Sequence, residues 1–166
     1  MRKHPSFEVI VFFLLLLVCS LPCFAQRVIV VVRHADKIDD TDDSVLSLTG
    51  QAQAQRLANV LKDVGISTIY TTQFKRTIQT ATPLADLLGI ELLAYEQMDV
   101  DGAVKEIREK HPKEVVMVVG HRSTVPKILK QFGASEPVAL GTSEYNSLFI
   151  LTLPPGQSPT LLHLHF

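Results

Sequence analysis

Two histidines and two arginines lie at points where the sequence predicts that a buried strand ends. Arg33 and His34 directly follow the apolar run 28–32, and His121 follows the apolar run 115–119 after one glycine. Arg76 comes a few residues after the short predicted strand 68–71. In an open α/β sheet the carboxyl ends of parallel strands share one edge, and ligands bind at that edge. We therefore expect these four side chains to converge on one pocket.

A pocket of this composition suits a phosphoryl group. Guanidinium groups donate paired hydrogen bonds to phosphate oxygens. An imidazole has an unperturbed pKa of about 6.5, so a histidine can be neutral at physiological pH and attack phosphorus through a ring nitrogen. Positive charge around it stabilises the transferring group, which is the larger part of catalysis in phosphoryl transfer. The pattern predicts phosphoryl chemistry that needs neither a thiolate nor a metal ion.

Apolar runs alternate with amphipathic segments along most of the chain. Strands are predicted at 28–32, 68–71, 91–93, 115–119, 148–153 and 160–166, and helices at 49–64 (capped by Thr49), 74–88, 102–110 and 125–132. Fully apolar strands are typical of a sheet that helices cover on both faces. The alternation predicts an α/β fold, a three-layer α/β/α sandwich around a mostly parallel sheet. A turn at 154–156 allows an antiparallel edge.

Four segments add a family resemblance to this interpretation. They are Val31-Val32-Arg33-His34-Ala35, Leu48-Thr49-Gly50-Gln51-Ala52-Gln53-Ala54, Tyr70-Thr71-Thr72 with Arg76-Thr77 and Thr80-Ala81, and Val118-Val119-Gly120-His121. At these residues the chain resembles the histidine phosphatase superfamily, also called phosphoglycerate mutase-like. The resemblance implies that fold, with His34 as the nucleophile. It also implies Arg33, Arg76 and His121 as ligands of the phosphoryl group.

The chain departs from the family pattern at two positions. Ala35 stands where the family usually has glycine, and its methyl group is tolerated if the backbone there does not need a positive φ. Arg122 follows the second histidine, where the acid-phosphatase and phytase branch has aspartate. We expect Arg122 and Lys37 to add substrate contacts, and the proton donor to come from elsewhere.

The loop after the third predicted strand offers three carboxylates as the proton donor. These are Glu96, Asp99 and Asp101. By the resemblance, a glutamate follows the third strand in the mutase-like branch, so Glu96 is the predicted donor. Asp36, which lies close to the nucleophile in the sequence, is the alternative.

Two further groups of polar residues are interpreted as structural. His163 and His165 alternate with leucines, so on a strand they share one polar face. A metal-binding pair is the alternative interpretation, but we predict no metal site and no cofactor. The acidic run 39–43 is expected to be a solvated loop close to the strand end that carries His34.

The first 25 residues have the layout of a secretory signal peptide. Arg2 and Lys3 precede an almost uncharged apolar run, 9–21, which is shorter than the roughly 20 residues that a membrane-spanning helix needs. Cleavage after Ala25 leaves one histidine phosphatase domain, residues 26–166. The expectation is a small exported protein of bacterial type, periplasmic or secreted. An uncleaved membrane anchor is the alternative.

The composition supports a single globular domain, because 46% of the residues are hydrophobic and 20% are charged. Both cysteines, Cys19 and Cys23, lie within the predicted signal segment. The mature chain therefore has no thiol for a disulfide, a thiolate metal site or catalysis. A formal net charge of −1 argues against a nucleic-acid partner, and no membrane contact is expected after cleavage.

These observations predict an exported, metal-independent phosphomonoester hydrolase that works through a phosphohistidine on His34. The substrate is a phosphorylated small molecule or a phosphoprotein, and the sequence predicts no oligomeric state. The alternatives are a phosphomutase and a non-catalytic module that binds phosphate or phosphoproteins on the same fold. A mutase is disfavoured because little sequence separates the strands to build a lid that excludes water.

Overall fold

The computed structural model describes residues 27–166, so the predicted signal segment lies outside the described residues. The strands are β1 (Arg27–Arg33), β2 (Ile66–Thr72), β3 (Leu92–Tyr95), β4 (Val115–Gly120), β5 (Ser147–Leu153) and β6 (Thr160–His165), and the helices are α2 (Leu48–Leu61), α3 (Lys75–Leu88), α4 (Val100–Lys110) and α5 (Val125–Phe132). The strands form one sheet in the order β3-β2-β4-β1-β5-β6. The first four are parallel, and β5 and β6 form an antiparallel edge. The predicted mostly parallel sheet is confirmed.

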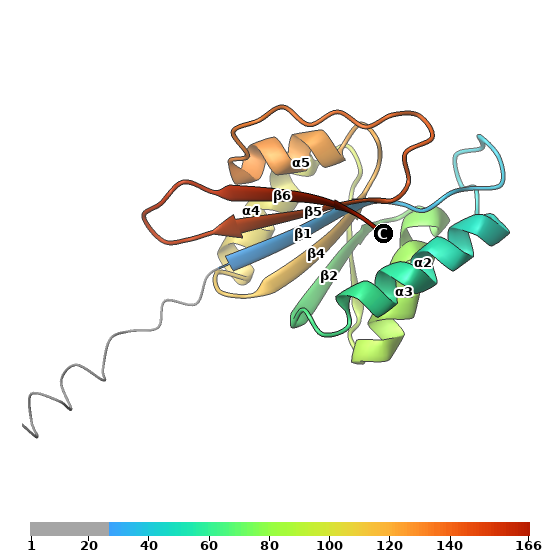
Figure 1. The fold of residues 1–166 in the computed structure, drawn as a ribbon, viewed down its shortest axis with the longest axis horizontal. Coiled ribbons are helices and arrows are strands. Elements are labelled where there is room, and N and C mark those ends of the chain that lie inside the picture. Colours follow the sequence, from blue (N-terminus) through green and yellow to red (C-terminus); the bar gives the residue numbers. More distant parts are fainter. Residues whose placement is uncertain (1–26) are drawn as a thin grey trace, which may run out of the picture.

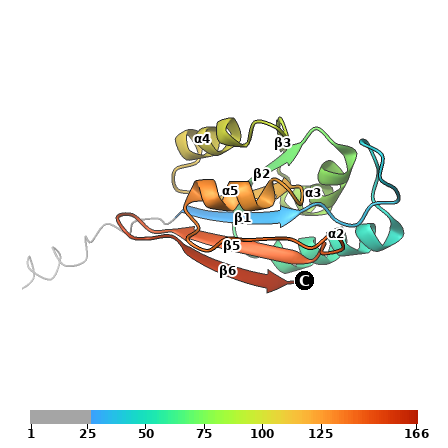
Figure 2. The same cartoon turned by 90° about the horizontal axis from the view of Figure 1, so that it is seen from above.

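Helices cover both faces of this sheet and produce three layers (Figure 1, Figure 2). Residues that alternate along β1 point to opposite faces. Ile29 and Val31 pack with α4 and α5, whereas Val30 and Val32 pack with α2 and α3. All four side chains are fully buried, as the unbroken apolar run of this central strand predicted. The three-layer α/β/α sandwich is confirmed.

Local capping signals explain where three of the helices begin or end. Ser47 caps α2, because its hydroxyl accepts a hydrogen bond from the Gly50 amide at 3.0 Å. The prediction that Thr49 caps this helix is wrong by two residues, since Thr49 lies in the first turn. Helices α3 and α5 end at Gly89 and Gly133, whose φ angles of 66° and 99° favour glycine.

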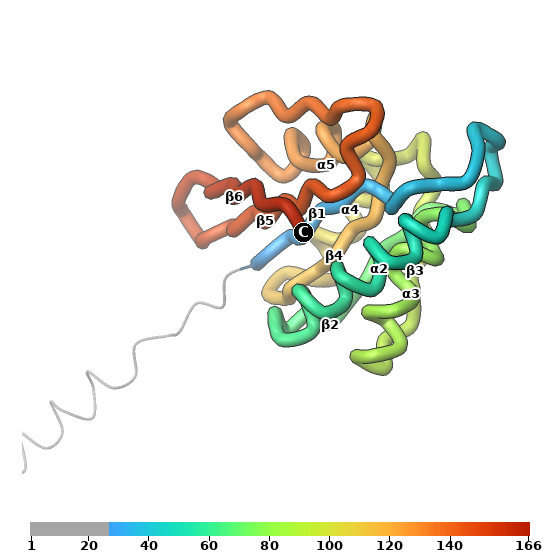
Figure 3. Tube along the Cα trace, turned by 45° about the vertical axis from the view of Figure 1, so that its right-hand side comes forward, coloured from blue at the N-terminus to red at the C-terminus, as the bar shows by residue number. Residues whose placement is uncertain are grey.

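The segment 133–146 links α5 to β5 and returns to the edge of the sheet where β1 and β4 end (Figure 1, Figure 3). It therefore reaches side chains at the carboxyl end of β1. Beyond β5, strand β6 forms the outer edge of the sheet. None of the helices in the described part of the chain has the length and apolar character needed to span a membrane.

Candidate active site

Four of the predicted side chains meet at the carboxyl edge of the parallel strands. Arg33 ends β1 and His34 follows it, His121 follows β4, and Arg76 lies in the first turn of α3. Strands β1 and β4 pair with Arg33 opposite Gly120, and the His34 amide donates to the Gly120 carbonyl at 2.9 Å. All four side chains are buried. The structure thus brings together the two arginines and two histidines that the sequence singled out.

Arg33 is held by backbone carbonyls. Its Nη1 atom donates to the carbonyl oxygens of Gly141, Thr142 and Glu144 at 3.1, 2.8 and 2.9 Å. The ring of Tyr145 covers the guanidinium carbon, with 3.9 Å between that carbon and the ring centroid. Because the acceptors are neutral carbonyls, they fix the side chain and leave its full positive charge available to a ligand.

Arg76 is held in a similar way. Its Nη1 atom donates to the backbone carbonyl of Asp42, and its guanidinium lies over the ring of Phe74, 4.5 Å from the ring centroid. The acidic run 39–43, predicted as a solvated loop near the strand end, therefore reaches the rim of the site through its backbone. The Nη2 atom of Arg76 lies 3.3 Å from Nδ1 of His121.

One nitrogen of each arginine has no partner within the described residues. Among residues 27–166, the buried side-chain nitrogen and oxygen atoms without a hydrogen-bond partner are Nε of Arg33 and Nε of Arg76. An unsatisfied buried donor costs about 1–3 kcal/mol, or more when the group is charged. Two such cationic donors in one cluster indicate that the site is built to receive an anion.

His34 has a ring nitrogen ready to act as a nucleophile. Its Nδ1 atom lies 2.8 Å from the carbonyl oxygen of Ala35. Since a carbonyl only accepts, Nδ1 carries the proton and Nε2 keeps a free electron pair. Burial, reinforced by the charges of Arg33 and Arg76, lowers the pKa of His34 to about 4. No described non-glycine residue has a positive φ, so Ala35 is accommodated without strain, as the sequence required.

His121 differs because both of its ring nitrogens are engaged by the protein. Nδ1 accepts from Arg76, because a guanidinium only donates, and Nε2 lies 3.0 Å from the Thr72 hydroxyl. The Thr72 hydroxyl in turn lies 2.9 Å from that of Thr77. Burial, followed by the proximity of His34 and of Arg76, lowers the pKa of His121 to about 3. This imidazole therefore has no ring nitrogen free for attack.

Lys37 and Arg122 lie beside this cluster. Within the described residues, neither side chain forms a hydrogen bond with the four side chains of the cluster. The Lys37 amino group is 2.7 Å from the Asp40 carboxylate. Burial lowers the pKa of the Arg33 guanidinium, and the charge of Arg122 adds to the effect. Arg122 is itself exposed. Both cations are near enough to extend the positive potential of the site toward solvent.

None of the carboxylates considered as the proton donor forms a hydrogen bond or ion pair with the four side chains of the cluster within residues 27–166. Glu96 is exposed on the loop between β3 and α4. Asp99 caps α4 by accepting from the amide of Gly102. The Asp36 carboxylate accepts a hydrogen bond from Ser47 at 2.7 Å, so it supports the start of α2.

Tyr145 and Thr72 were not identified from the sequence. Tyr145 covers Arg33, and its ring centroid lies 5.8 Å from that of His34. Nothing in the sequence marks it, because it lies in an irregular segment more than a hundred residues from Arg33. Thr72 had a usable signal, since it ends a buried strand at the same edge as His34.

The sequence matches a known family over part of its length. Residues 29–99 match the model described as the histidine phosphatase superfamily (branch 1). The chain is also 34% identical over 84 residues to human 6-phosphofructo-2-kinase/fructose-2,6-bisphosphatase 1, which covers 45% of this chain. The match spans only 17% of the human protein.

Solved structures share the fold across most of the chain. The protein histidine phosphatase SixA, complexed with tungstate, is similar with a TM-score of 0.70 and 20% identity, over 83% of this chain and 96% of that one. A mycobacterial glucosyl-3-phosphoglycerate phosphatase is similar with a TM-score of 0.65 and 17% identity, over 82% and 97%. At these identities the likeness shows the fold alone. The chain is thus similar to the histidine phosphatase superfamily in sequence over residues 29–99 and shares its fold with these phosphatases over most of its length.

Proposed function

We propose that the protein is a phosphomonoester hydrolase in which His34 accepts the phosphoryl group of the substrate. The observation that carries this proposal is the pair of buried, unpartnered Nε atoms of Arg33 and Arg76 beside the free electron pair of His34 Nε2. Both guanidinium charges act on His34, because each contributes to its lowered pKa. An electron-poor phosphorus bound by these donors is the partner that such a nucleophile requires.

The proposed reaction has two steps. In the first, Nε2 of His34 bonds to phosphorus, the ester P–O bond breaks, and the leaving oxygen takes a proton. In the second, a water oxygen bonds to phosphorus and gives a proton back to the group that protonated the leaving oxygen, the N–P bond breaks with its electron pair returning to Nε2, and phosphate leaves. Arg33 and Arg76 bind the non-bridging oxygens in both steps, and His121 is proposed to join them by exchanging one of its present hydrogen bonds for one to the phosphoryl group. Glu96 is proposed to donate the proton to the leaving oxygen, and Lys37 and Arg122 to contact the rest of the substrate.

Fixed positive charge is the main source of the proposed catalysis. Each guanidinium rests on backbone carbonyls instead of carboxylates, so no anion within residues 27–166 forms an ion pair with it. Donors held in place before the reaction stabilise the charge that develops on the transferring group without reorganisation. We propose that these side chains make the reaction independent of metal ions and of cofactors.

The substrate is proposed to be a phosphorylated small molecule or a phosphoprotein. SixA is described as a protein histidine phosphatase and the mycobacterial relative as a sugar-phosphoglycerate phosphatase, so this fold accommodates both classes. The acidic run 39–43 at the rim disfavours a substrate that is highly anionic beyond its phosphate. A panel should therefore compare phosphohistidine peptides with simple phosphate esters.

The test is hydrolysis of p-nitrophenyl phosphate and of that panel by the purified protein, with and without EDTA. Turnover that persists in EDTA and is abolished in His34→Ala supports the proposal. His111→Ala is the matched control, because this histidine contacts Tyr70 and Glu114 away from the phosphate site. Binding of phosphate esters without turnover would favour the non-catalytic module, and phosphoryl transfer between two positions of one substrate would favour the mutase.

We also propose that residues 1–25 direct export and are removed, which places the mature protein in the periplasm or outside the cell. This rests on the pattern of the sequence alone. Mass spectrometry of the protein from a fractionated bacterial host tests it. A mature N-terminus at Gln26 supports cleavage, and an intact N-terminus in the membrane fraction supports an anchor.

A further inference from the structure

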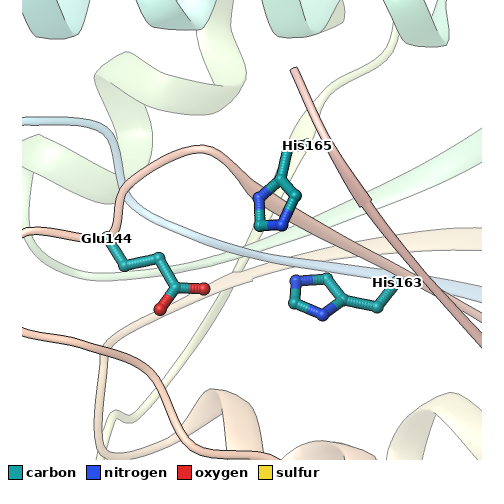
Figure 4. Close-up of side chains that lie close together, drawn as sticks. All are labelled: Glu144, His163 and His165. Atoms are coloured by element: carbon teal, nitrogen blue, oxygen red, sulfur yellow. The ribbon is translucent and has the colours of Figure 1, made fainter.

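A second cluster of polar side chains lies on the antiparallel side of the sheet. Glu144 lies in the segment before β5, and His163 and His165 lie on β6 (Figure 4). Residues two apart on a strand point to the same face, so the two imidazoles lie side by side. The pairing of β5 with β6 puts His165 opposite Ser147, three residues after Glu144. Strand register therefore brings Glu144 to the two histidines, which lie about twenty residues further along the chain.

The distances within this cluster suit a metal ion. Each side chain offers one ligand atom, and these atoms all lie within 4.8 Å of one another. The ring centroids of His163 and His165 are 4.7 Å apart. A tetrahedral Zn²⁺ site, with bonds of roughly 2.0–2.2 Å, holds its ligand atoms about 3.4 Å apart. Small rotations close the difference, because both imidazoles are exposed.

Neighbouring contacts already orient two of the three ligands. The Ser147 hydroxyl donates to the Glu144 carboxylate and lies 2.9 Å from Nε2 of His163. The Gly141 amide donates to the other carboxylate oxygen at 2.9 Å. The ring of Phe149 stacks on His163, with 4.3 Å between centroids and 21° between planes. Metal ligands in proteins are held by surrounding contacts of this kind.

We propose that Glu144, His163 and His165 bind one divalent transition-metal ion of the Zn²⁺ class. Two imidazoles and a carboxylate suit Zn²⁺ or Cu²⁺, whereas Ca²⁺ and Mg²⁺ require a shell made mainly of oxygen ligands. Three protein ligands leave the fourth position of a tetrahedral site to water. This assignment replaces the expectation that the two histidines form only a polar face. It is separate from the proposed phosphoryl transfer, whose positive charge comes from Arg33 and Arg76.

The ion would connect two parts of the chain that lie side by side in the fold. It would tie the segment before β5, through Glu144, to the edge strand β6. The backbone carbonyl of Glu144 also accepts from Nη1 of Arg33 at 2.9 Å, so the ion would brace one of the supports of that arginine. A ligand that binds only the folded state stabilises it in proportion to its affinity. Zn²⁺ should therefore raise the melting temperature.

Zn²⁺ titration of tag-free protein, stripped with a chelator and then dialysed, tests the proposal by calorimetry. We expect one equivalent with a dissociation constant of about 1 μM or lower. His165→Ala should weaken binding by at least the roughly 10- to 100-fold that loss of an outer contact costs. His111→Ala is the matched control, because His111 lies 3.0 Å from the Glu114 carboxylate but belongs to no three-ligand cluster within residues 27–166. It should bind as the wild-type protein does.

Electron paramagnetic resonance with Cu²⁺ identifies the ligands directly. Two coordinated imidazole nitrogens are expected in the wild-type protein and one in His165→Ala. Circular dichroism checks that each variant is folded. If His165→Ala does not fold, Glu144→Gln serves as the second variant. Absence of saturable Zn²⁺ binding by the wild-type protein, or equal affinity in the folded variant, overturns the proposal. Neither readout depends on phosphatase activity, so this proposal and the proposed function fail separately.

Discussion

The imidazole rings of His34 and His121 lie 5.3 Å apart, inclined by 63°, yet their hydrogen bonds make them chemically unequal. His34 Nε2 has no hydrogen-bond partner within residues 27–166, whereas both nitrogens of His121 are engaged, by Arg76 and by Thr72. The two residues follow adjacent parallel strands and look equivalent in the sequence. Of the two imidazoles, that of His34 is the one with a ring nitrogen left free, as the proposed attack on phosphorus requires.

Only His34 should become phosphorylated. A phosphoramidate is labile in acid, so turnover must be quenched with alkali before the labelled protein is isolated. His121→Ala should still be labelled, but slowly, because it loses a phosphate ligand and keeps the nucleophile. His34→Ala should carry no label. Label that persists in His34→Ala and disappears in His121→Ala would show that the two histidines have been assigned the wrong roles.

Arg76→Ala should lower kcat by on the order of 10²- to 10³-fold, the usual cost of removing one preorganised donor to developing charge. In the proposed mechanism this side chain binds the phosphoryl group, and its buried Nε atom has no acceptor within the described residues. Arg56→Ala is the control, because Arg56 is exposed on α2. Steady-state kinetics with an aryl phosphate measures both. A near-normal rate in Arg76→Ala would show that its guanidinium does not act on the substrate.

Stability should fall as the pH falls from about 6.5 toward 5. Burial lowers the pKa of His34 to about 4 and of His121 to about 3. In this window the unfolded chain therefore binds protons that the folded protein does not, so the free energy of unfolding rises with pH. The loss is on the order of 2 kcal/mol for each histidine at pH 5.

Urea unfolding at a series of pH values measures this effect. The double variant His34→Asn with His121→Asn should lose most of the dependence between pH 6.5 and 5, while keeping the acid instability that arises from carboxylates at lower pH. A wild-type free energy of unfolding that is constant across this window would mean that the two imidazoles titrate normally in the folded protein.

Glu96→Gln should slow the hydrolysis of an alkyl phosphate by on the order of 10²-fold and affect p-nitrophenyl phosphate much less. A nitrophenolate leaves without protonation, whereas an alkoxide does not. Asp36→Asn, assayed in parallel, tests the alternative donor, and Glu91→Gln is the exposed control. Equal slowing of both substrates in Glu96→Gln, or none, would remove Glu96 from this role.

Gly50→Ala should destabilise the protein although alanine favours helices. A Cβ atom at this position would overlap the backbone carbonyl of Asp36, and overpacking costs about 1–3 kcal/mol. The gain in helix propensity is at most about 1 kcal/mol. Gly141→Ala is the matched control, since the nearest atom to its Cβ would be 3.5 Å away. Thermal unfolding of the two variants decides whether the steric overlap or the gain in helix propensity is larger. An unchanged or higher Tm for Gly50→Ala would contradict the prediction.

The parts of this site that the sequence predicts are those carried by buried strands. The β-branched run before Arg33 and the run before His121 fixed two neighbouring strands, and parallel pairing then placed their polar ends together. The support of Arg33 was not predictable in this way. Its acceptors are backbone carbonyls of Gly141, Thr142 and Glu144, and a carbonyl has no residue-type signal.

Two other differences have a physical origin. Ser47 and Thr49 can both cap a helix, but only Ser47 has its hydroxyl bound to Asp36 as well, which selects the earlier start. The shared face of His163 and His165 follows from their spacing, whereas the approach of Glu144 follows from the register of β5 and β6, which the sequence does not encode locally.

The hydrogen bond between His34 Nδ1 and the Ala35 carbonyl selects one regioisomer of the proposed intermediate. Phosphohistidine exists in two forms that differ in which ring nitrogen bears phosphorus. Phosphorylation at Nδ1 would break a buried hydrogen bond of 2.8 Å and set the phosphoryl group against a carbonyl oxygen. Phosphorylation at Nε2 preserves that bond, which also holds the ring plane fixed while the N–P bond forms. The peptide group after the nucleophile therefore excludes one isomer before any substrate has bound.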